Sequence, residues 1–507
     1  DHFHNVVEMH RQVVYPDDLD LLLVELELLS TGRKVFHNLH YRWMGKNHET
    51  IWINCRGRVL SDPEDGSPRY LVGCINEIGA KQKADNVSGL LGEYSLKIFY
   101  ESRSPKLPQG FLLRIGIDDF KNINESHGNE YGDYILRRTA QCIEENIGSE
   151  QSLFHIVADE FAVVDFSGGS VQQAEDLFHE IKKSIYAFIE QNQYKAVYTV
   201  SGGIVKNGDV DNSFENAMKL SEFALSEAKE RGKNSCYVFE EEEYEDYLKS
   251  RTLLRQLHHA VNNGFEGFEA YFQPLVNAAN GELTGAETLL RFHSPEGGMV
   301  SPGEFIPILE ESGLIIPVGR WVLRQALDAC REWQKILPEF KVNVNLSYVQ
   351  VLKSRVLTDV RRIVDEFGVK PSSVCIELTE SGYLEENERF DKVWNGLKEY
   401  GVLLALDDFG TGYSNLRCLS DLKPAYIKID RSFTLKALNR EYEYRLLNHI
   451  VEMSHSLGLH VCVEGIETEG ELTKAKQTEP DYIQGFLFGK PCSRAEFTQK
   501  FFTKQAG

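Results

Sequence analysis

The sequence predicts an α/β multidomain protein whose C-terminal half is a (β/α)8 barrel. In that half, eight short apolar segments each carry a polar or acidic residue at or near their C-terminal end. These residues are Gln273, Glu287, Asn345, Glu377, the pair Asp407–Asp408, Lys428, Glu464 and Gln484. Apolar runs of strand length that stop at carboxylates, repeated around one domain, are typical of a barrel whose strand ends form a metal site. The length of 507 residues predicts about three domains.

The composition and charge argue against several classes of function. A hydrophobic share of 42% with 26% charged residues is ordinary for a globular protein. The net charge of −22 argues against binding to DNA, RNA or an anionic membrane. Nine cysteines without a CxxC pair favour reduced thiols and a cytoplasmic location. No apolar stretch has the length of a membrane helix, and no signal peptide is visible. The chain starts in what looks like the middle of a domain, so a sensory or membrane segment upstream is an open alternative.

Residues 1–80 begin with a helical segment, YPDDLDLLLVELELLSTG, and continue with three strand-like runs. The runs FHNLHYRWM, TIWINCRGRVL and RYLVGCINEI are separated by the turn-forming GKN and DPEDG. This arrangement resembles the C-terminal two-thirds of a PAS domain, in which Asp17 and Asp18 open a helix and Trp52 lies in a central strand. The resemblance implies a partial PAS domain that serves dimerisation or signal relay rather than ligand binding.

Residues 81–248 alternate strands with amphipathic helices. FLLRIGI, HIVADEFAVVDF and AVYTVSGGIV are expected to be strands, and YGDYILRRTAQCIEENI and NAMKLSEFALSEAKERG to be helices. The acidic run EEEEYEDY at 240–247 is expected to be a solvated helix or linker face.

This middle region resembles the GGDEF family, which condenses two GTP molecules into cyclic di-GMP. The signature position reads Val157-Ala158-Asp159-Glu160-Phe161, and the family's D-x-D-x-F-K motif begins with Gly116 in place of the first metal-binding aspartate. The family's product-inhibition motif is also missing, and we expect no cyclase turnover. The family positions that remain include Asn124, Asp133, Asp159 and Lys229. They imply a degenerate domain that either binds GTP and regulates its neighbour or serves as a structural dimerisation unit; both interpretations stay open.

Residues 249–507 resemble the EAL phosphodiesterases, which open cyclic di-GMP to linear pGpG in a TIM-like barrel. The name-giving triplet reads Glu287-Thr288-Leu289, and the other motifs follow in the family's order. The oxygen-bearing ligands, without histidine or cysteine, favour two Mg²⁺ or Mn²⁺ ions rather than zinc. By resemblance, the first ion is held by Glu287, Asn345, Glu377 and Asp407, and the second by Asp407, Asp408 and Glu464.

The resemblance also implies the remaining roles. Lys428 would lie beside the attacking water, as a general base or as an orienting cation, and would act together with Asp408 and Glu464. The expected substrate-binding residues are Gln273, Leu289, Arg291, Glu467 and Gln484. The segment Asp408–Ser414 matches the family's mobile loop, and Glu380 matches the residue that anchors it.

The sequence therefore predicts a cyclic di-GMP phosphodiesterase with a regulatory or structural GGDEF-like domain and a partial PAS domain, associated as a homodimer. The main alternative is a non-catalytic receptor that binds cyclic di-GMP through the EAL-like barrel and signals by conformation. A bifunctional cyclase and phosphodiesterase is the third hypothesis, and Gly116, Val157 and Ala158 argue against it.

Overall fold

The computed structural model describes residues 13–44, 50–62, 66–78, 85, 87–103, 109–193, 195–209, 213–379, 388–410 and 416–503. It divides into two compact units, Asp1–Glu245 and Asp246–Gly507, joined in sequence by α8 (Glu241–Asn262). No helix within these described ranges is both long and apolar enough to cross a membrane. The domain boundaries expected at 80/81 and 248/249 stay predictions.

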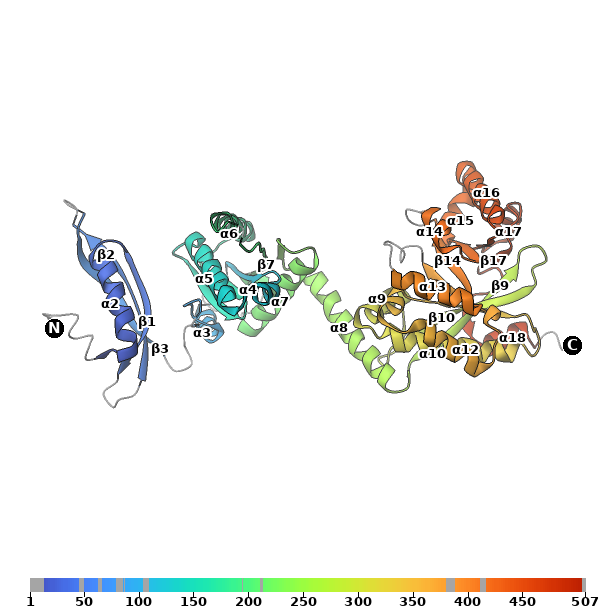
Figure 1. Ribbon diagram of the computed structural model, residues 1–507, viewed down its shortest axis with the longest axis horizontal. Helices are drawn as coiled ribbons and strands as arrows, with labels where there is room; N and C mark the ends of the chain where they lie inside the picture. Colours follow the sequence, from blue (N-terminus) through green and yellow to red (C-terminus); the bar gives the residue numbers. More distant parts are fainter. Residues whose placement is uncertain are drawn as a thin grey trace. The chain divides into compact units, whose positions relative to one another are not determined.

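The first part of the N-terminal unit is a helix against an antiparallel sheet. Helix α2 (Pro16–Ser30) precedes strands β1 (Phe36–Met44), β2 (Thr50–Ser61) and β3 (Pro68–Ile78), which pair in the order β1–β2–β3 (Figure 1). A small core of Val14, Leu22, Tyr41 and Ile53 joins helix to sheet. Trp52 lies in the middle strand, as the PAS resemblance implies.

The second part is a five-stranded sheet between two layers of helices. The strands are β4 (Phe111–Ile117), β5 (Gln151–Val157), β6 (Glu160–Asp165), β7 (Val200–Lys206) and β8 (Cys236–Val238), in the order β5–β6–β4–β7–β8. The helices are α3 (Glu93–Arg103), α4 (Phe120–His127), α5 (Asn129–Asn146), α6 (Val171–Gln191) and α7 (Phe214–Glu230). Because successive side chains of a strand face opposite sides, β4 sends Leu113 and Ile115 toward α5 and α6 and Leu112 toward α3 and α7.

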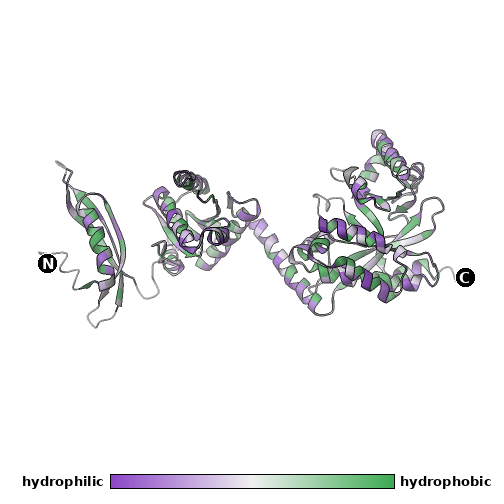
Figure 2. Cartoon of the chain, viewed as in Figure 1, coloured by the Kyte–Doolittle hydropathy of each residue, from purple (hydrophilic) through white to green (hydrophobic). Residues whose placement is uncertain are grey.

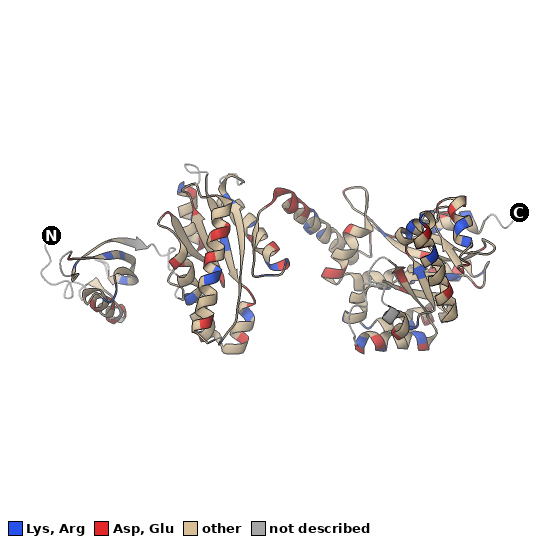
Figure 3. Cartoon of the chain, turned by 90° about the horizontal axis from the view of Figure 1, so that it is seen from above, with Lys and Arg blue, Asp and Glu red and all other residues tan. Residues whose placement is uncertain are grey.

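The acidic run lies at the start of α8. Glu241, Glu242 and Glu243 form its first turn and are exposed, in agreement with the expected solvated helix face (Figure 3). Carboxylates at this end also interact favourably with the positive end of the helix dipole, and this interaction stabilises the helix.

The C-terminal unit is a closed barrel of eight strands. They are β9 (Phe268–Asn277), β10 (Leu283–His293), β12 (Lys341–Asn345), β13 (Val374–Thr379), β14 (Leu403–Phe409), β15 (Tyr426–Ile429), β16 (His460–Val463) and β17 (Tyr482–Gln484). Two short strands, β11 (Met299–Val300) and β18 (Cys492–Ser493), pair at its margins. The helices of this unit after α8 are α9 (Pro302–Ser312), α10 (Ile315–Trp333), α11 (Tyr348–Lys353), α12 (Val356–Phe367), α13 (Glu388–Tyr400), α14 (Leu416–Leu422), α15 (Arg431–Asn439), α16 (Glu441–Ser456), α17 (Glu469–Lys476) and α18 (Arg494–Phe501).

The eight predicted segments are the eight barrel strands, but β9 runs antiparallel to both of its neighbours, β10 and β17. Only five residues, 278–282, connect β9 to β10. A connection this short joins antiparallel strands, whereas a parallel pair needs a crossover of a dozen residues or more. Gln273 therefore lies in the middle of its strand rather than at a C-terminal end, level with Glu287.

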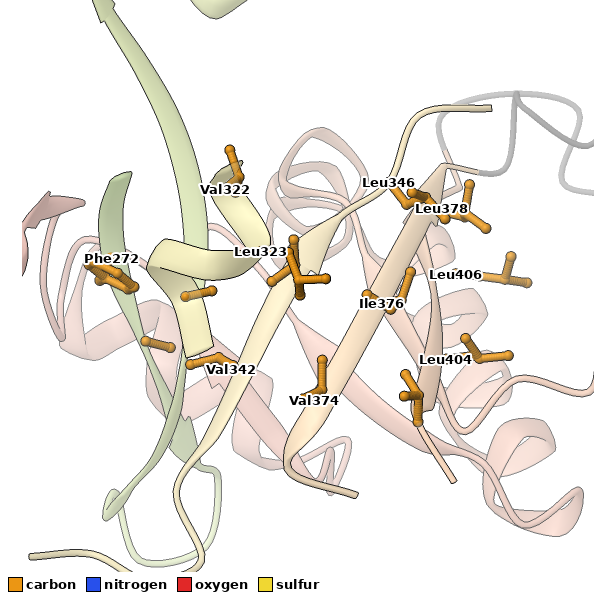
Figure 4. Close-up of a cluster of buried hydrophobic side chains, with 14 of the residues drawn as sticks. Phe272, Val322, Leu323, Val342, Leu346, Val374, Ile376, Leu378, Leu404 and Leu406 are labelled. Carbon is orange, nitrogen blue, oxygen red and sulfur yellow. The ribbon is translucent and has the colours of Figure 1, made fainter. Parts of the chain in front are cut away.

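Alternation along the strands separates the apolar core from the polar interior of the barrel. The apolar residues of β12, β13 and β14 pack with α10 and with one another in a continuous core, which Figure 4 shows for Val342, Val374, Ile376, Leu404 and Leu406. Figure 2 shows hydrophobic colouring along the strands of this unit and more hydrophilic colouring on its outer helices. The residues between these positions, which include Asn343, Glu377 and Asp407, consequently face the interior of the barrel.

Candidate functional site

The strand register brings the acidic residues to one end of the barrel. Asn345 pairs with Glu377 across β12 and β13, and Thr379 pairs with Asp407 across β13 and β14. Glu464 follows directly after β16. Since the C-terminal ends of parallel strands meet at one face of a barrel, side chains more than a hundred residues apart in sequence become neighbours there.

Lys428 lies at the centre of this group. Its Nζ is 2.8 Å from Glu464 Oε1, 3.0 Å from Glu377 Oε2, 3.1 Å from Glu287 Oε2 and 3.3 Å from Asp407 Oδ1. The lysine side chain is 2% exposed, so the four ion pairs are shielded from solvent. One ammonium cannot neutralise four carboxylates, and the group carries a surplus of buried negative charge.

Three amides orient the carboxylates. Asn345 Nδ2 donates to Glu287 Oε1 at 2.9 Å, and Gln484 Nε2 donates to Glu287 Oε2 at 2.8 Å. Gln484 Nε2 also lies 3.1 Å from Gln273 Oε1. Asn343 Nδ2 donates to Glu377 Oε1 at 2.7 Å, which leaves Glu377 Oε2 directed at Lys428.

The backbone of Asp408 explains how two adjacent aspartates can serve one site. Asp408 has φ +56°, in the left-handed region, and the pairing of β14 with β15 is irregular between Leu406 and Phe409. An irregularity of this kind breaks the strict alternation of a strand and redirects a side chain. The backbone N–H of Asp408 donates to Asp407 Oδ1 at 2.9 Å, which fixes the turn.

The surplus of negative charge appears in the pKa values. Burial raises the pKa of Glu464 to about 8 and that of Asp408 to about 6, and neighbouring carboxylates add to both shifts. Burial also raises the pKa of Glu377 well above its ordinary value. For Lys428, burial acts to lower the pKa, but the surrounding carboxylates outweigh it and raise the pKa well above its ordinary value. The ammonium is therefore protonated in this arrangement.

The donor set fits hard divalent cations. Carboxylate oxygens of Glu287, Glu377 and Asp407 lie within 4.8 Å of one another, close enough to share an ion. Glu464 also contacts the ammonium, and Asp408 interacts with it electrostatically, so two divalent cations would balance the charge that five ionised carboxylates and one ammonium leave. Burial of unbalanced carboxylates is costly, so this set favours cation binding.

Two of the other predicted substrate-binding residues, Arg291 and Glu467, have partners of their own. Leu289 and Arg291 follow Glu287 by two and four residues on β10, so the three side chains share one face of the strand, and the Arg291 guanidinium lies 5.6 Å from the centre of the Tyr271 ring. Glu467 pairs with Arg431 at 2.5 Å, so its carboxylate is already held by a cation. Glu380 and residues 411–414 of the expected mobile loop lie outside the described residues.

The residues that the GGDEF resemblance singles out occupy two places. Asn124 contacts Gly132, next to Asp133, where α4 meets α5; a Cβ on Gly132 would lie 1.8 Å from Asn124 Oδ1. Asp159 lies in the hairpin between β5 and β6 and interacts electrostatically with Lys229 of α7.

Asn343 is a site residue that the sequence reasoning missed. It is 7% exposed and holds one oxygen of Glu377. The available signal was its spacing: in VNVNLS it precedes Asn345 by two residues, so both amides face the barrel interior.

Comparison with known proteins agrees with these three folds. The model of the EAL domain matches residues 254–491, that of the diguanylate cyclase GGDEF domain matches 95–235, and that of the PAS fold matches 1–75. MucR of Pseudomonas aeruginosa, a bifunctional diguanylate cyclase/cyclic di-GMP phosphodiesterase, is 29% identical over 381 residues, which cover 75% of this chain and 55% of MucR. The cyclic di-GMP phosphodiesterase PdeR of Escherichia coli is 29% identical over 455 residues, 89% of this chain and 67% of PdeR.

A solved structure of the PaMucR phosphodiesterase in complex with c-di-GMP aligns with a TM-score of 0.46 and 32% identity, over 48% of this chain and 99% of that one. The chain spans about half the length of several curated relatives that it matches, MucR among them. The chain is thus a multidomain protein with a PAS fold, a GGDEF domain and an EAL domain in that order, related to GGDEF–EAL signalling proteins.

Proposed function

We propose that the chain is a cytoplasmic phosphodiesterase that hydrolyses cyclic di-GMP to linear pGpG in its EAL barrel. The observation that carries the proposal is the set of four carboxylates around Lys428, with Asp408 next to Asp407 in the chain, which has the charge and the oxygen ligands for two Mg²⁺ or Mn²⁺ ions. Cyclic di-GMP is the proposed substrate because the related proteins MucR and PdeR are both named as cyclic di-GMP phosphodiesterases.

In this proposal Glu287, Asn345, Glu377 and Asp407 hold one cation, and Asp407, Asp408 and Glu464 hold the other. When bound, the cations lower the pKa of a coordinated water and stabilise charge on the phosphoryl oxygens. Gln484 and Asn345 orient Glu287, Asn343 orients Glu377, and Arg291 provides a guanidinium for a phosphate oxygen. Lys428 either orients the attacking water or accepts its proton. Bound cations would neutralise the carboxylates and so lower the pKa of Lys428. The pKa of Lys428 in the metal-loaded protein therefore decides between the two roles.

We further propose that the GGDEF domain makes no cyclic di-GMP and regulates the barrel through GTP. Ala158, where the family has a glycine, has φ +51°, a left-handed conformation that costs a residue with a Cβ about 1–2 kcal/mol. Val157 beside it is 55% exposed, so two apolar side chains cover the turn that a nucleotide would approach. Association as a homodimer stays a prediction.

Product analysis tests these assignments. The full chain is incubated with cyclic di-GMP and Mg²⁺ or Mn²⁺, and separately with GTP, and the products are separated chromatographically. Formation of pGpG supports the phosphodiesterase; binding of cyclic di-GMP without turnover would instead identify a receptor. Cyclic di-GMP formed from GTP would refute the inactive GGDEF assignment. Glu377→Gln, which keeps the shape of the side chain but removes a ligand charge, is the negative control.

A further inference from the structure

Helix α10 contains a glycine where alanine would stabilise the helix. Gly319 lies inside α10, and a glycine in a helix interior costs about 0.5–1 kcal/mol relative to alanine. Its φ is not positive, so the backbone conformation does not require glycine. A Cβ built on Gly319 would overlap the side-chain amide of Gln350, at 2.8 Å from its Cδ. The glycine therefore makes room for this amide.

The Gln350 amide holds the chain where it enters helix α11. Gln350 is 6% exposed, and its Oε1 accepts the backbone N–H of Ser347 at 3.0 Å. Ser347 Oγ in turn accepts the backbone N–H of Val349 at 3.2 Å. This reciprocal arrangement is a capping box, which fixes the conformation of the first turn of α11.

Two further contacts hold the same turn from other elements. Ser347 Oγ donates to Glu310 Oε1 of α9 at 2.6 Å. The backbone N–H of Leu346 donates to the carbonyl of Glu377 in β13 at 2.9 Å. The turn after β12 is thus attached to α9, α11 and β13.

Asn345 lies directly before this turn, as the last residue of β12. Its Nδ2 donates to Glu287 Oε1 at 2.9 Å. Asn345, Gln350 and Gly319 all line one small cavity of about 30 Å³, so the Gln350 amide is close to the backbone that carries Asn345. A displacement of this amide would release the N–H of Ser347 and change the direction of the Asn345 side chain.

We propose that Gln350 is a positioning residue for the metal site of the barrel, and that position 319 is glycine because it must accommodate the Gln350 amide. Gln350 acts through Asn345, which is proposed to hold only one of the two cations. A change at Gly319 or Gln350 should therefore weaken one metal-binding event and leave the other. This inference rests on the metal-binding part of the proposed function and extends it to two residues outside the strand ends.

Titration of the full chain with Mn²⁺ by calorimetry, without substrate, tests the proposal. We expect Gly319→Ala and Gln350→Ala each to weaken one of two Mn²⁺-binding events by about tenfold, the lower end of the range for groups that orient a metal ligand. A cap that only stabilises α11 would change the melting temperature but not the Mn²⁺ affinity. Unchanged Mn²⁺ affinities in both folded variants would overturn the proposal.

A double variant tests whether the two residues act together. If alanine at position 319 acts by displacing the Gln350 amide, it has no effect once the amide is absent. Gly319→Ala/Gln350→Ala should therefore bind Mn²⁺ as Gln350→Ala does. Losses that add up in the double variant would overturn the proposed link.

Gly396→Ala is the matched control. Gly396 lies inside α13, and a Cβ there would lie 2.5 Å from Leu357 Cδ2 of α12, so this variant also disturbs a contact between helices. It should leave both Mn²⁺ dissociation constants within about twofold of the wild type. A loss of Mn²⁺ affinity equal to that of Gly319→Ala would indicate a general packing effect and overturn the proposal.

A variant of the turn keeps the test possible if Gly319→Ala fails to fold by circular dichroism. Ser347→Ala removes the hydroxyl that contacts Glu310 and caps α11, and it should weaken the same Mn²⁺-binding event as Gln350→Ala. Ser347→Thr keeps the hydroxyl and should retain the affinity. Equal Mn²⁺ affinities for Ser347→Ala and Ser347→Thr would contradict the role of this turn.

The same proteins separate this inference from the proposed function. If the variants weaken Mn²⁺ binding but the wild type forms no pGpG from cyclic di-GMP, the positioning role stands and the phosphodiesterase assignment fails. If the wild type forms pGpG and the variants bind Mn²⁺ as the wild type does, the phosphodiesterase stands and the positioning role fails.

Discussion

Replacement of Lys428 by methionine is expected to destabilise the metal-free barrel strongly. Methionine has a similar length but no charge, so four carboxylates now within 2.8 to 3.3 Å of the ammonium would lose their common counter-charge. Removal of one partner from a buried ion pair costs about 3–5 kcal/mol. At about 2–4 °C per kcal/mol for a domain of this size, the Tm of the barrel should fall by roughly 6–20 °C.

Thermal unfolding followed by tryptophan fluorescence measures this effect, because three of the five tryptophans, Trp321, Trp333 and Trp394, lie in the barrel unit. The loss in Tm should be largest in EDTA and smaller in saturating Mg²⁺, since bound cations would neutralise the same carboxylates. Lys436→Met, at an exposed position on α15, is the matched control. A Lys428→Met protein that melts with the wild type in EDTA would refute the view that this ammonium balances the buried charge.

Three further outcomes are expected. Mg²⁺ affinity should rise with pH between about 6 and about 8, because Asp408 and Glu464, with pKa values raised to about 6 and about 8, must release protons to bind the ion; calorimetry in two buffers of different ionisation enthalpy detects those protons. In EDTA, folding stability should fall as pH rises: the folded state binds more protons at these two groups than the unfolded state does, so the contribution of Asp408 is lost between its ordinary pKa of 3.8 and about 6, and that of Glu464 between 4.5 and about 8. Asn343→Val should weaken metal binding by about 10–100-fold while the fold by circular dichroism is kept, since Glu377 loses the amide that orients it; unchanged metal titration would contradict this. Glu380→Ala should lower metal affinity and turnover without unfolding the domain, and wild-type kinetics and metal dependence would exclude its role as a loop anchor.

The barrel and its polar interior could be predicted because the signal is local. Glu377 lies between two apolar residues, Ile376 and Leu378. Because side chains alternate along a strand, the glutamate faces away from the core when its neighbours face it. Asn345 lies between Val344 and Leu346 in the same way, and Asp407 follows Leu406 in phase with it, so the sequence alone predicts these side chains on one surface. Their assembly at one end then follows from the parallel arrangement of the strands.

Other features could not be predicted, because they depend on backbone geometry or on contacts between residues far apart in the sequence. The left-handed conformation of Asp408 and the irregular pairing beside it are properties of the β14–β15 pair. The antiparallel direction of β9 follows from the short connection before β10, which the sequence shows but which the expectation of a regular (β/α)8 repeat overrode. Arg114 and Glu160 are 46 residues apart and meet because β4 and β6 are neighbours in the sheet.

The acidic site of the barrel and the carboxylates of the GGDEF domain differ in how their charge is balanced. In the barrel, Lys428 contacts four carboxylates and interacts electrostatically with Asp408, and the four charges that these five groups leave when ionised match two divalent cations. In the GGDEF domain, by contrast, Glu160 is paired with Arg114, and Asp118 accepts hydrogen bonds from Thr199 and Ser201, so these two carboxylates already have protein partners. Chelation should consequently destabilise the barrel unit and spare the GGDEF domain. A protein in which EDTA lowered both unfolding transitions equally would contradict this difference between the two domains.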